Sequence, residues 1–423
     1  MSESQPSAPK GSVGGRAGLV TVSQGLSSVT NLFVVLWAAH TISAIDFGKF
    51  SLLLLVYAFV MGPVHAVVSM RVVVHPHDAD QRPRDVLGNA FALGLGGGAA
   101  CALVGVAQII AGWDLGPALV TLGLFLPFLV LHDVGRWVGV ARSQPVRAVT
   151  LDALWLAAMV GGAILVHSTL PATLLNLTAV WAGSGALASL LLLAQYGFLR
   201  PREIFSTWLR ERWHASWRLL VGNVTATGSA LAGASLIAIV STPLAVAAVR
   251  GAILLGRPTS AIQNAVASSM AADVAREQSD DRSLMRHQQR TMLVSAGVAL
   301  INLVVLFAIP DSLGRAVLGN VWPVLAPLLL PVSLWLIAAA AQAGAPPALI
   351  GRRQFQTAMV VQIVGGLLNV TALVGGAVIA GVEGAVWGLV VGQLAMAACW
   401  WFGLVRYLRR RRVPEPTQAA SDE

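Results

Sequence analysis

Five ionisable residues lie inside the long apolar stretches of this sequence, and their side chains are the ones most suited to binding or chemistry: Arg136, Arg250, Arg257, Asp133 and Asp152. A charge in such surroundings is costly. An uncompensated arginine at the centre of a bilayer costs at least about 2.5 to 3.5 kcal/mol. Each of the five is therefore expected to face a charged partner in the protein or a water-filled cavity.

Arg250 and Arg257 are seven residues apart, which is two helical turns and places them on one helix face. No acidic residue precedes Asp273 in that apolar stretch. Two guanidinium groups on one face without a local counter-ion fit a pyrophosphate, which arginine binds in bidentate fashion. We predict that both bind substrate in a basic cavity, with Arg257 the deepest charge. The alternatives are that they pair with Asp133 or Asp152 across the bundle, or that one snorkels to the surface.

Asp133 and Arg136 are three residues apart, so they can form a salt bridge within one helix. That structural role is favoured for Arg136 over the alternative role of binding substrate in the cavity. Asp152 lies one turn into the following span, where it can meet Arg142 or Arg147. Asp133 and Asp152 are thus candidates for structural pairs or for coupling to a cation. His65 and His132 are weaker candidates, because a lone histidine in a span is usually a packing residue.

The elements that must position these residues are membrane helices. Hydrophobic residues make up 56% of the 423 residues, charged residues 11%, and the mean hydropathy is +0.73. Such a composition excludes a water-soluble globular protein. We predict an all-α integral membrane protein with about twelve transmembrane helices in two six-helix halves around a central cavity. The spans are predicted at residues 18–43, 50–74, 86–110, 117–141, 149–167, 173–195, 219–239, 244–272, 291–309, 320–345, 355–379 and 385–405.

Charge also divides the chain along its length. The stretch 198–218 combines several arginines with Trp208, Trp213 and Trp217, which fall toward one side of a single helix. This pattern predicts an amphipathic hinge in the membrane interface, with an ordinary soluble connector as the alternative. The sequence therefore predicts a cytoplasmic N-terminal tail, an N-terminal lobe, a cytoplasmic hinge, a C-terminal lobe and a basic cytoplasmic tail, at residues 1–17, 18–195, 196–218, 219–405 and 406–423.

The distribution of basic residues sets the expected orientation. With the N-terminus inside, 23 of the 28 Lys and Arg residues fall on the cytoplasmic side, and only Lys49 and Arg315 fall outside. Cytoplasmic loops retain such an excess of positive charge. Both termini are therefore predicted to be cytoplasmic. The scarcity of lysine among the basic residues, with abundant Ala, Gly and Val, indicates a GC-rich bacterial genome.

No cofactor is expected, because the sequence contains no nucleotide-binding motif. Its two cysteines, Cys101 and Cys399, lie in apolar runs and indicate neither a disulfide framework nor a metal site. The glycines of the run GLGGG, residues 94–98, are predicted to allow close packing of helices. No predicted outer loop is long enough to carry catalytic groups, so an enzyme is not expected.

Several stretches resemble one family. The first hairpin, GLSSVTNLFVVLWAAHTISAIDFGKFSLLL, resembles the opening of polysaccharide flippases, the O-antigen type, of the multidrug/oligosaccharidyl-lipid/polysaccharide (MOP) superfamily. The later stretches LGNVW, ALIGRR and GVEGAVWGLVVGQ, at 318–322, 348–353 and 381–393, resemble the same family. The resemblance covers essentially the whole chain but rests on degenerate apolar patterns.

This resemblance implies translocation of a polyprenyl-pyrophosphate-linked glycan precursor across the bacterial cytoplasmic membrane by alternating access. It also implies membrane lipids, and a glycan polymerase or glycosyltransferases, as partners, and no nucleic acid. The main alternative is a cation-coupled drug or metabolite exporter of the same superfamily. That alternative calls for an embedded carboxylate, yet residues 18–74 contain no acid except Asp46 in a turn. A membrane glycan polymerase and a non-transporting scaffold are the remaining alternatives.

Overall fold

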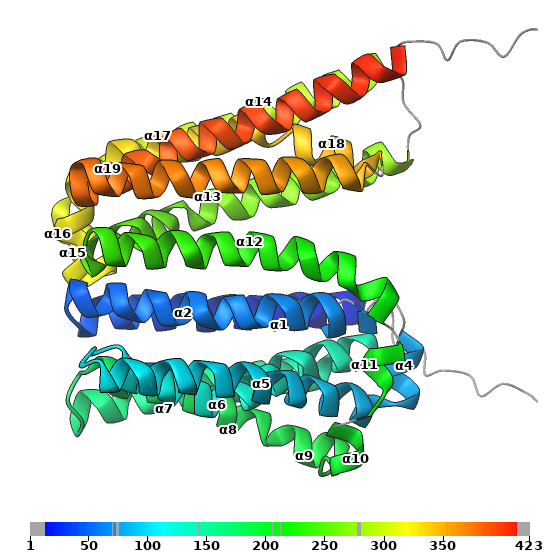
Figure 1. Ribbon diagram of the computed structural model, residues 1–423, viewed down its shortest axis with the longest axis vertical. Helices are drawn as coiled ribbons and strands as arrows, with labels where there is room; N and C mark the ends of the chain where they lie inside the picture. Colours follow the sequence, from blue (N-terminus) through cyan, green and yellow to red (C-terminus); the bar gives the residue numbers. More distant parts are fainter. Residues whose placement is uncertain are drawn as a thin grey trace, which may run out of the picture. The chain divides into compact units, whose positions relative to one another are not determined.

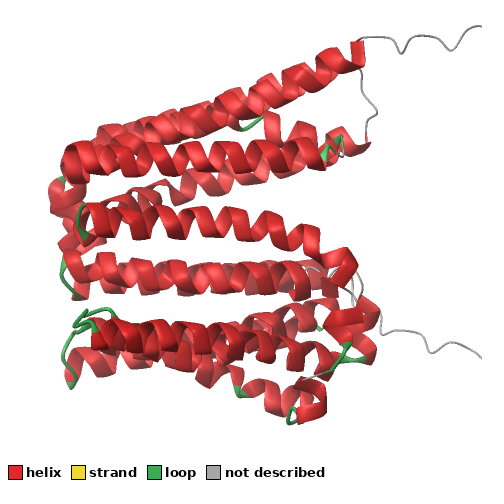
Figure 2. Cartoon of the chain, viewed as in Figure 1, coloured by secondary structure: helices red, strands yellow, loops and turns green. Residues whose placement is uncertain are grey.

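A computed structural model of the chain describes residues 13–412, except 70, 73–75, 143, 205, 212, 277–280 and 353. All secondary structure in those residues is helical (Figure 2). Eight stretches of this described chain are helical, long and apolar enough to cross a membrane, and the last runs through two helices joined at a kink. Three further helices, α1 (Val13–Thr41), α12 (Trp213–Val240) and α13 (Pro243–Arg276), match the remaining expected spans. The prediction of an all-α membrane protein is confirmed.

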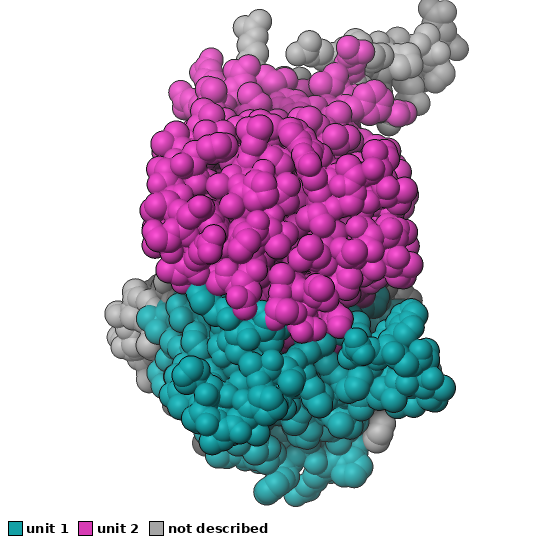
Figure 3. Space-filling view, turned by 90° about the vertical axis from the view of Figure 1, so that its left-hand side faces the viewer, with its two compact units in different colours: residues 1–42, 56–223 teal, residues 43–55, 224–423 magenta. Residues whose placement is uncertain are grey.

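The chain divides into two compact units (Figure 3). The first contains Met1–Ile42 and Val56–Asn223, and the second contains Ser43–Leu55 and Val224–Glu423. Besides α1, the helices of the first unit are α4 (Pro76–Gln81), α5 (Pro83–Ile110), α6 (Gly116–Ala141), α7 (Pro145–Ser168), α8 (Leu174–Ser189), α9 (Leu191–Tyr196), α10 (Pro201–Ile204) and α11 (Trp208–Glu211).

Helix α2 (Ala44–Val64) belongs to both units, which the expected lobes did not anticipate. A Cβ atom on Gly48 would collide with the backbone of Pro243, so a glycine is needed where the first turns of α2 meet the start of α13. After Pro63 the helix widens into a π-helical turn, His65–Ser69. The His65 ring packs on Trp137 with 5.3 Å between ring centroids, as expected for a packing histidine.

Helices α5 and α6 lie side by side in Figure 1 and pack closely through glycine. A Cβ atom on Gly98 would collide with the carbonyl oxygen of Gly123, and one on Gly94 would lie 2.7 Å from the Cα atom of Pro127. Gly96, on the opposite face, has open space around it. The expected role of the glycine run in helix packing is therefore confirmed for Gly94 and Gly98.

Arginines predicted to be cytoplasmic gather at one end of the first unit. Figure 1 places α4, α10 and α11 at this end. The contacts there join loops that are far apart in sequence: Arg82 with Glu211 at 3.4 Å, Arg142 with Asp80 at 3.7 Å, Arg84 with Glu203 at 3.9 Å, and Arg147 with the Gln195 carbonyl oxygen at 3.1 Å. Within this unit, the antiparallel helices thus bring the predicted inside loops together.

The single amphipathic helix expected over 198–218 is wrong. Pro201 begins α10, and the backbone N–H of Arg200 donates to Glu203 Oε2 at 2.7 Å. A second helical turn, α11, begins beyond Thr207, whose hydroxyl bonds Glu211 Oε1 at 2.5 Å. These local caps start new helices, so no continuous Trp face forms. Trp208 is fully buried.

In the second unit, α13 is followed by α14 (Asp281–Ala308), α15 (Asp311–Leu318), η2 (Gly319–Val321), α16 (Trp322–Leu325), η3 (Ala326–Leu328), α17 (Leu329–Gln342), α18 (Ala345–Gly351) and α19 (Phe355–Arg412). The start of the expected span 320–345 is wrong, because short 3₁₀ segments interrupt it. Gly319 has φ +52°, and Pro323 and Pro327 lack the amide hydrogens that a continuous helix requires.

Helix α19 consists of two arms that meet at Ala380 and Gly381. Gly381 has φ +57° and ψ −128°, a conformation that favours glycine. Beyond the kink the arms pack through Gly376 and Gly384, where a Cβ atom on either would collide with the backbone of the other. The kink falls in the predicted loop between spans 355–379 and 385–405. The arms thus correspond to two spans rather than one.

Candidate functional site

The first unit holds a buried charge cluster centred on Arg136 of α6. Its Nε atom lies 3.1 Å from Asp152 Oδ1, and its Nη1 atom lies 3.3 Å from Asp133 Oδ1 and donates to Ser27 Oγ at 3.1 Å. The other oxygen of Asp152 accepts a hydrogen bond from Ser23 Oγ at 2.6 Å. Helices α1, α6 and α7 are therefore joined by one polar network. Arg136 is 6% exposed and Asp152 is 0% exposed.

The predicted pair of Asp133 and Arg136 is confirmed. Asp152 meets Arg136 rather than Arg142 or Arg147, because its turn of α7 faces α6 and α1. With both carboxylates ionised, the three side chains carry one net negative charge. Such a cluster can hold a proton or a small cation, as well as fix the helices.

Ser23 and Ser27 were missed by the sequence analysis. They are four residues apart in a predicted span and thus share a helix face, which was the available signal. His132 packs against Trp155 with 4.7 Å between ring centroids, as expected for a packing histidine.

The second unit contains a cavity of about 230 Å³. Most of its lining is apolar, including Leu55 of α2. The polar side chains that line it are Arg250 of α13, Ser229 of α12, and Gln362 and Asn369 of the first arm of α19. The cavity thus combines one guanidinium with neutral hydrogen-bonding groups. Among the residues the structure describes, Arg250 has no carboxylate partner within salt-bridge distance.

Packing between the arms of α19 positions these amides. A Cβ atom on Gly392 of the second arm would lie 2.9 Å from the Cα atom of Asn369, so the backbones approach closely there. Gln362 and Asn369 are seven residues apart and share a helix face, like Arg250 and Arg257. This spacing of amides inside an apolar span was the signal that the sequence analysis missed.

Arg257 is half-buried and does not line this cavity. The expectation that it is the deepest charge beside Arg250 is therefore not met in the cavity of the second unit. Arg257 lies two turns further along α13, next to Gly256, whose Cα faces Trp335 and Leu336 of α17. No salt bridge joins Arg257 to a carboxylate in the described part of the chain. It remains a predicted binding residue.

Groups of three or more His, Cys, Asp or Glu side chains that could hold a metal ion are absent from the described residues. No protein-family model matches the sequence, and no curated protein matches it. Solved structures do match it in fold. An inward-facing multidrug resistance MATE family transporter of the MOP superfamily has a TM-score of 0.69 at 13% identity, covering 93% of this chain and 100% of that chain.

A MOP superfamily transporter from Pyrococcus furiosus, for which a reverse polarity of the binding pocket suggests a different function, has a TM-score of 0.59 at 14% identity. An outward-facing MATE family transporter has the same TM-score and identity, and both matches cover 93% of this chain and 95% of the other. The protein is a multi-pass helical membrane protein. Its fold is the one found in MATE transporters of the MOP superfamily.

Proposed function

We propose that the protein translocates a polyprenyl-pyrophosphate-linked oligosaccharide or polysaccharide precursor across the bacterial cytoplasmic membrane by alternating access. It works as a flippase and not as an enzyme, and both termini lie in the cytoplasm. The fold supports transport, because structures of this fold are known in inward-facing and outward-facing conformations. The sequence resemblance to polysaccharide flippases supports the choice of substrate.

The observation that carries the proposal is the unequal neutralisation of arginine in the two units. In the first unit Arg136 is matched by Asp133 and Asp152. In the second unit Arg250 lines a cavity with serine and amide side chains, and no carboxylate pairs with it among the described residues. A half-buried, unpaired guanidinium beside neutral donors favours an anionic ligand. A pyrophosphate group has the charge and the oxygen atoms to fit it, with Arg257 further along the same face.

A cation-coupled exporter is the second candidate, and the excess carboxylate beside Arg136 favours it. That cluster is equally suited to couple an ion gradient to a flippase, so it does not choose between the substrates. Arg250 does choose. A cationic drug would be repelled by this guanidinium, whereas a lipid-linked pyrophosphate would be attracted.

Arg250→Gln tests the proposal, with Arg250→Lys as the charge-conserving variant. The exposed Arg315→Gln in the same unit is the matched control. Each variant is expressed in cells that lack the chromosomal copy, and surface glycan, lipid-linked intermediate and protein abundance are measured. Loss of a charged hydrogen bond, about 1.5 to 3 kcal/mol, predicts export reduced about tenfold or more for Gln. Lys restores part of it, because it keeps the charge but loses the planar fork.

The intermediate is expected to accumulate in the inner leaflet for Arg250→Gln at unchanged protein abundance. Export at the wild-type rate in that variant would overturn the proposal. Resistance to cationic drugs that is lost in cells without the protein and kept or raised by Arg250→Gln would support the exporter instead.

A further inference from the structure

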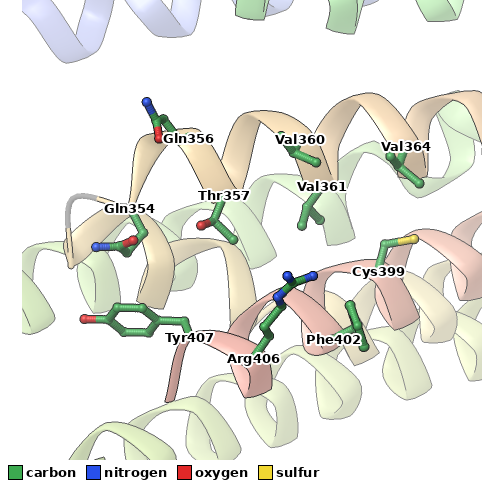
Figure 4. A pocket seen from close by; sticks show the side chains of 11 residues that line it. Gln354, Gln356, Thr357, Val360, Val361, Val364, Cys399, Phe402, Arg406 and Tyr407 are labelled. Carbon is green, nitrogen blue, oxygen red and sulfur yellow. The ribbon is translucent and has the colours of Figure 1, made fainter. Parts of the chain in front are cut away.

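A groove of about 420 Å³ runs between the two arms of α19, at the basic end of that helix. Gln354, Thr357 and Val361 of the first arm line it together with Phe402 and Arg406 of the second arm (Figure 4). The volume lies in the range of small-molecule sites. This groove is distinct from the cavity that Arg250 lines.

The apolar part of the groove is a narrow slot open to the outside of the second unit. Its floor is at Gly403, where a Cβ atom would lie 2.7 Å from Val361 Cγ2, so a larger residue would fill the slot. Val360, Val364 and Phe402 along it are 54%, 45% and 67% exposed. Exposed apolar side chains on a membrane span face lipid chains. At about 1.5 Å per residue, the slot from Thr357 to Val364 is roughly 10 Å long.

Polar groups lie only at the end of the groove next to the C-terminal arginines. There the exposed Arg406 extends from the second arm toward the first, and Thr357, Gln354 and Tyr407 lie at the same end (Figure 4). Within the described residues Arg406 has no carboxylate partner. The groove thus presents one cation and several hydrogen-bonding groups at the end of an apolar slot.

We propose that this groove binds one anionic phospholipid of the surrounding bilayer. Its phosphate contacts Arg406 and accepts hydrogen bonds from Gln354 and Thr357, and one acyl chain lies along Val360 and Phe402. Charge complementarity selects the anionic headgroup, since a basic groove between helices at the membrane surface attracts anionic lipid. The inference does not rest on the identity of the transported substrate.

Native mass spectrometry of the purified, delipidated full chain tests this, with phosphatidylglycerol as the probe and phosphatidylcholine as the neutral lipid. The first bound phosphatidylglycerol is expected to bind the wild type about tenfold more tightly than phosphatidylcholine. Arg406→Gln removes that preference, whereas Arg409→Gln, an exposed arginine on the same helix outside the groove, keeps it. Val364→Trp, which fills the slot, weakens binding of both lipids. Val391→Trp, equally apolar and exposed outside the groove, does not.

The proposal is overturned if the wild type binds both lipids alike, or if Arg406→Gln and Arg409→Gln behave alike. Geranylgeranyl pyrophosphate is included as a competitor. If it displaces phosphatidylglycerol and binds the groove more tightly, the groove holds a prenyl carrier and not a phospholipid. Glycan export by Arg406→Gln separates this test from that of the flippase, because Arg406 lies outside the cavity that Arg250 lines.

Discussion

Asp152 is the most confined ionisable side chain of the candidate site. Its carboxylate accepts from Ser23 Oγ on one oxygen and lies 3.1 Å from Arg136 Nε on the other, with no exposed surface. Asp133 contacts the same arginine, but its side chain is 19% exposed. Water can therefore replace the contact of Asp133 more easily than that of Asp152, and the two carboxylates are expected to differ in importance for stability.

Asp152→Asn is predicted to destabilise the protein more than the matched variant Asp133→Asn. Removing one partner of a buried ion pair costs about 3 to 5 kcal/mol, because the remaining charge is left without compensation. A partly exposed pair contributes about 1 kcal/mol or less. The midpoint of thermal unfolding in detergent measures both. Equal midpoints for the two variants would contradict the central place of Asp152 in the network.

At the scale of the element, glycine sets how closely the helices pack. In α5, Gly94 and Gly98 face α6 at backbone contact, and in α19, Gly392 lets the second arm approach Asn369. The first contact fixes α6, which carries Arg136. The second fixes the amide that lines the cavity with Arg250. The functional side chains are thus held by residues that have no side chain.

Gly98→Ala is predicted to lower the midpoint of unfolding, because the added methyl group collides with the backbone of Gly123. Forcing extra atoms into a packed contact costs about 1 to 3 kcal/mol. Gly96→Ala, two residues away on the open face, is the control and is expected to be neutral or slightly stabilising, since alanine is the better helix former. A fall of equal size in both variants would mean that helix propensity, and not packing against α6, governs this stretch.

At the scale of the whole molecule, the twelve expected spans and the MATE-type fold agree in covering nearly the entire chain. The excess of arginine on one side then predicts how the chain is inserted. Contacts between the loops of α4, α10 and α11 and the arginines of the first unit place these loops together, as an alternating topology requires.

We predict that Arg202 is cytoplasmic and that Ser312 faces outward. Both positions are exposed, so Arg202→Cys and Ser312→Cys can be introduced one at a time in a chain with Cys101→Ala and Cys399→Ala. In intact cells, an impermeant maleimide is expected to label Ser312→Cys only, and permeabilised cells should show labelling of both. Protection of Ser312→Cys with labelling of Arg202→Cys in intact cells would require the inverted topology.

The sequence by itself determined the class of the fold, because composition and length decide whether helices can cross a bilayer. It also predicted the bond between Asp133 and Arg136, since three residues on one helix are neighbours by local geometry alone. The break of α19 at Gly381 fell where a predicted loop separates two spans. These features depend on contacts close in sequence or on the hydrophobicity of a window.

The tertiary structure decided which distant residues meet. Asp152 contacts Arg136 and Ser23 rather than Arg142 or Arg147, because the rotation of α7 about its axis is set by packing with α1 and α6. The hinge divides into short helices, since Glu203 and Glu211 bond to backbone or side chain nearby and to arginines of α5 and its cap. Arg250 shares a cavity with Gln362 and Asn369 only because α13 and α19 pack together over more than a hundred intervening residues. A one-dimensional pattern carries the face of each helix but not the neighbour that the face meets.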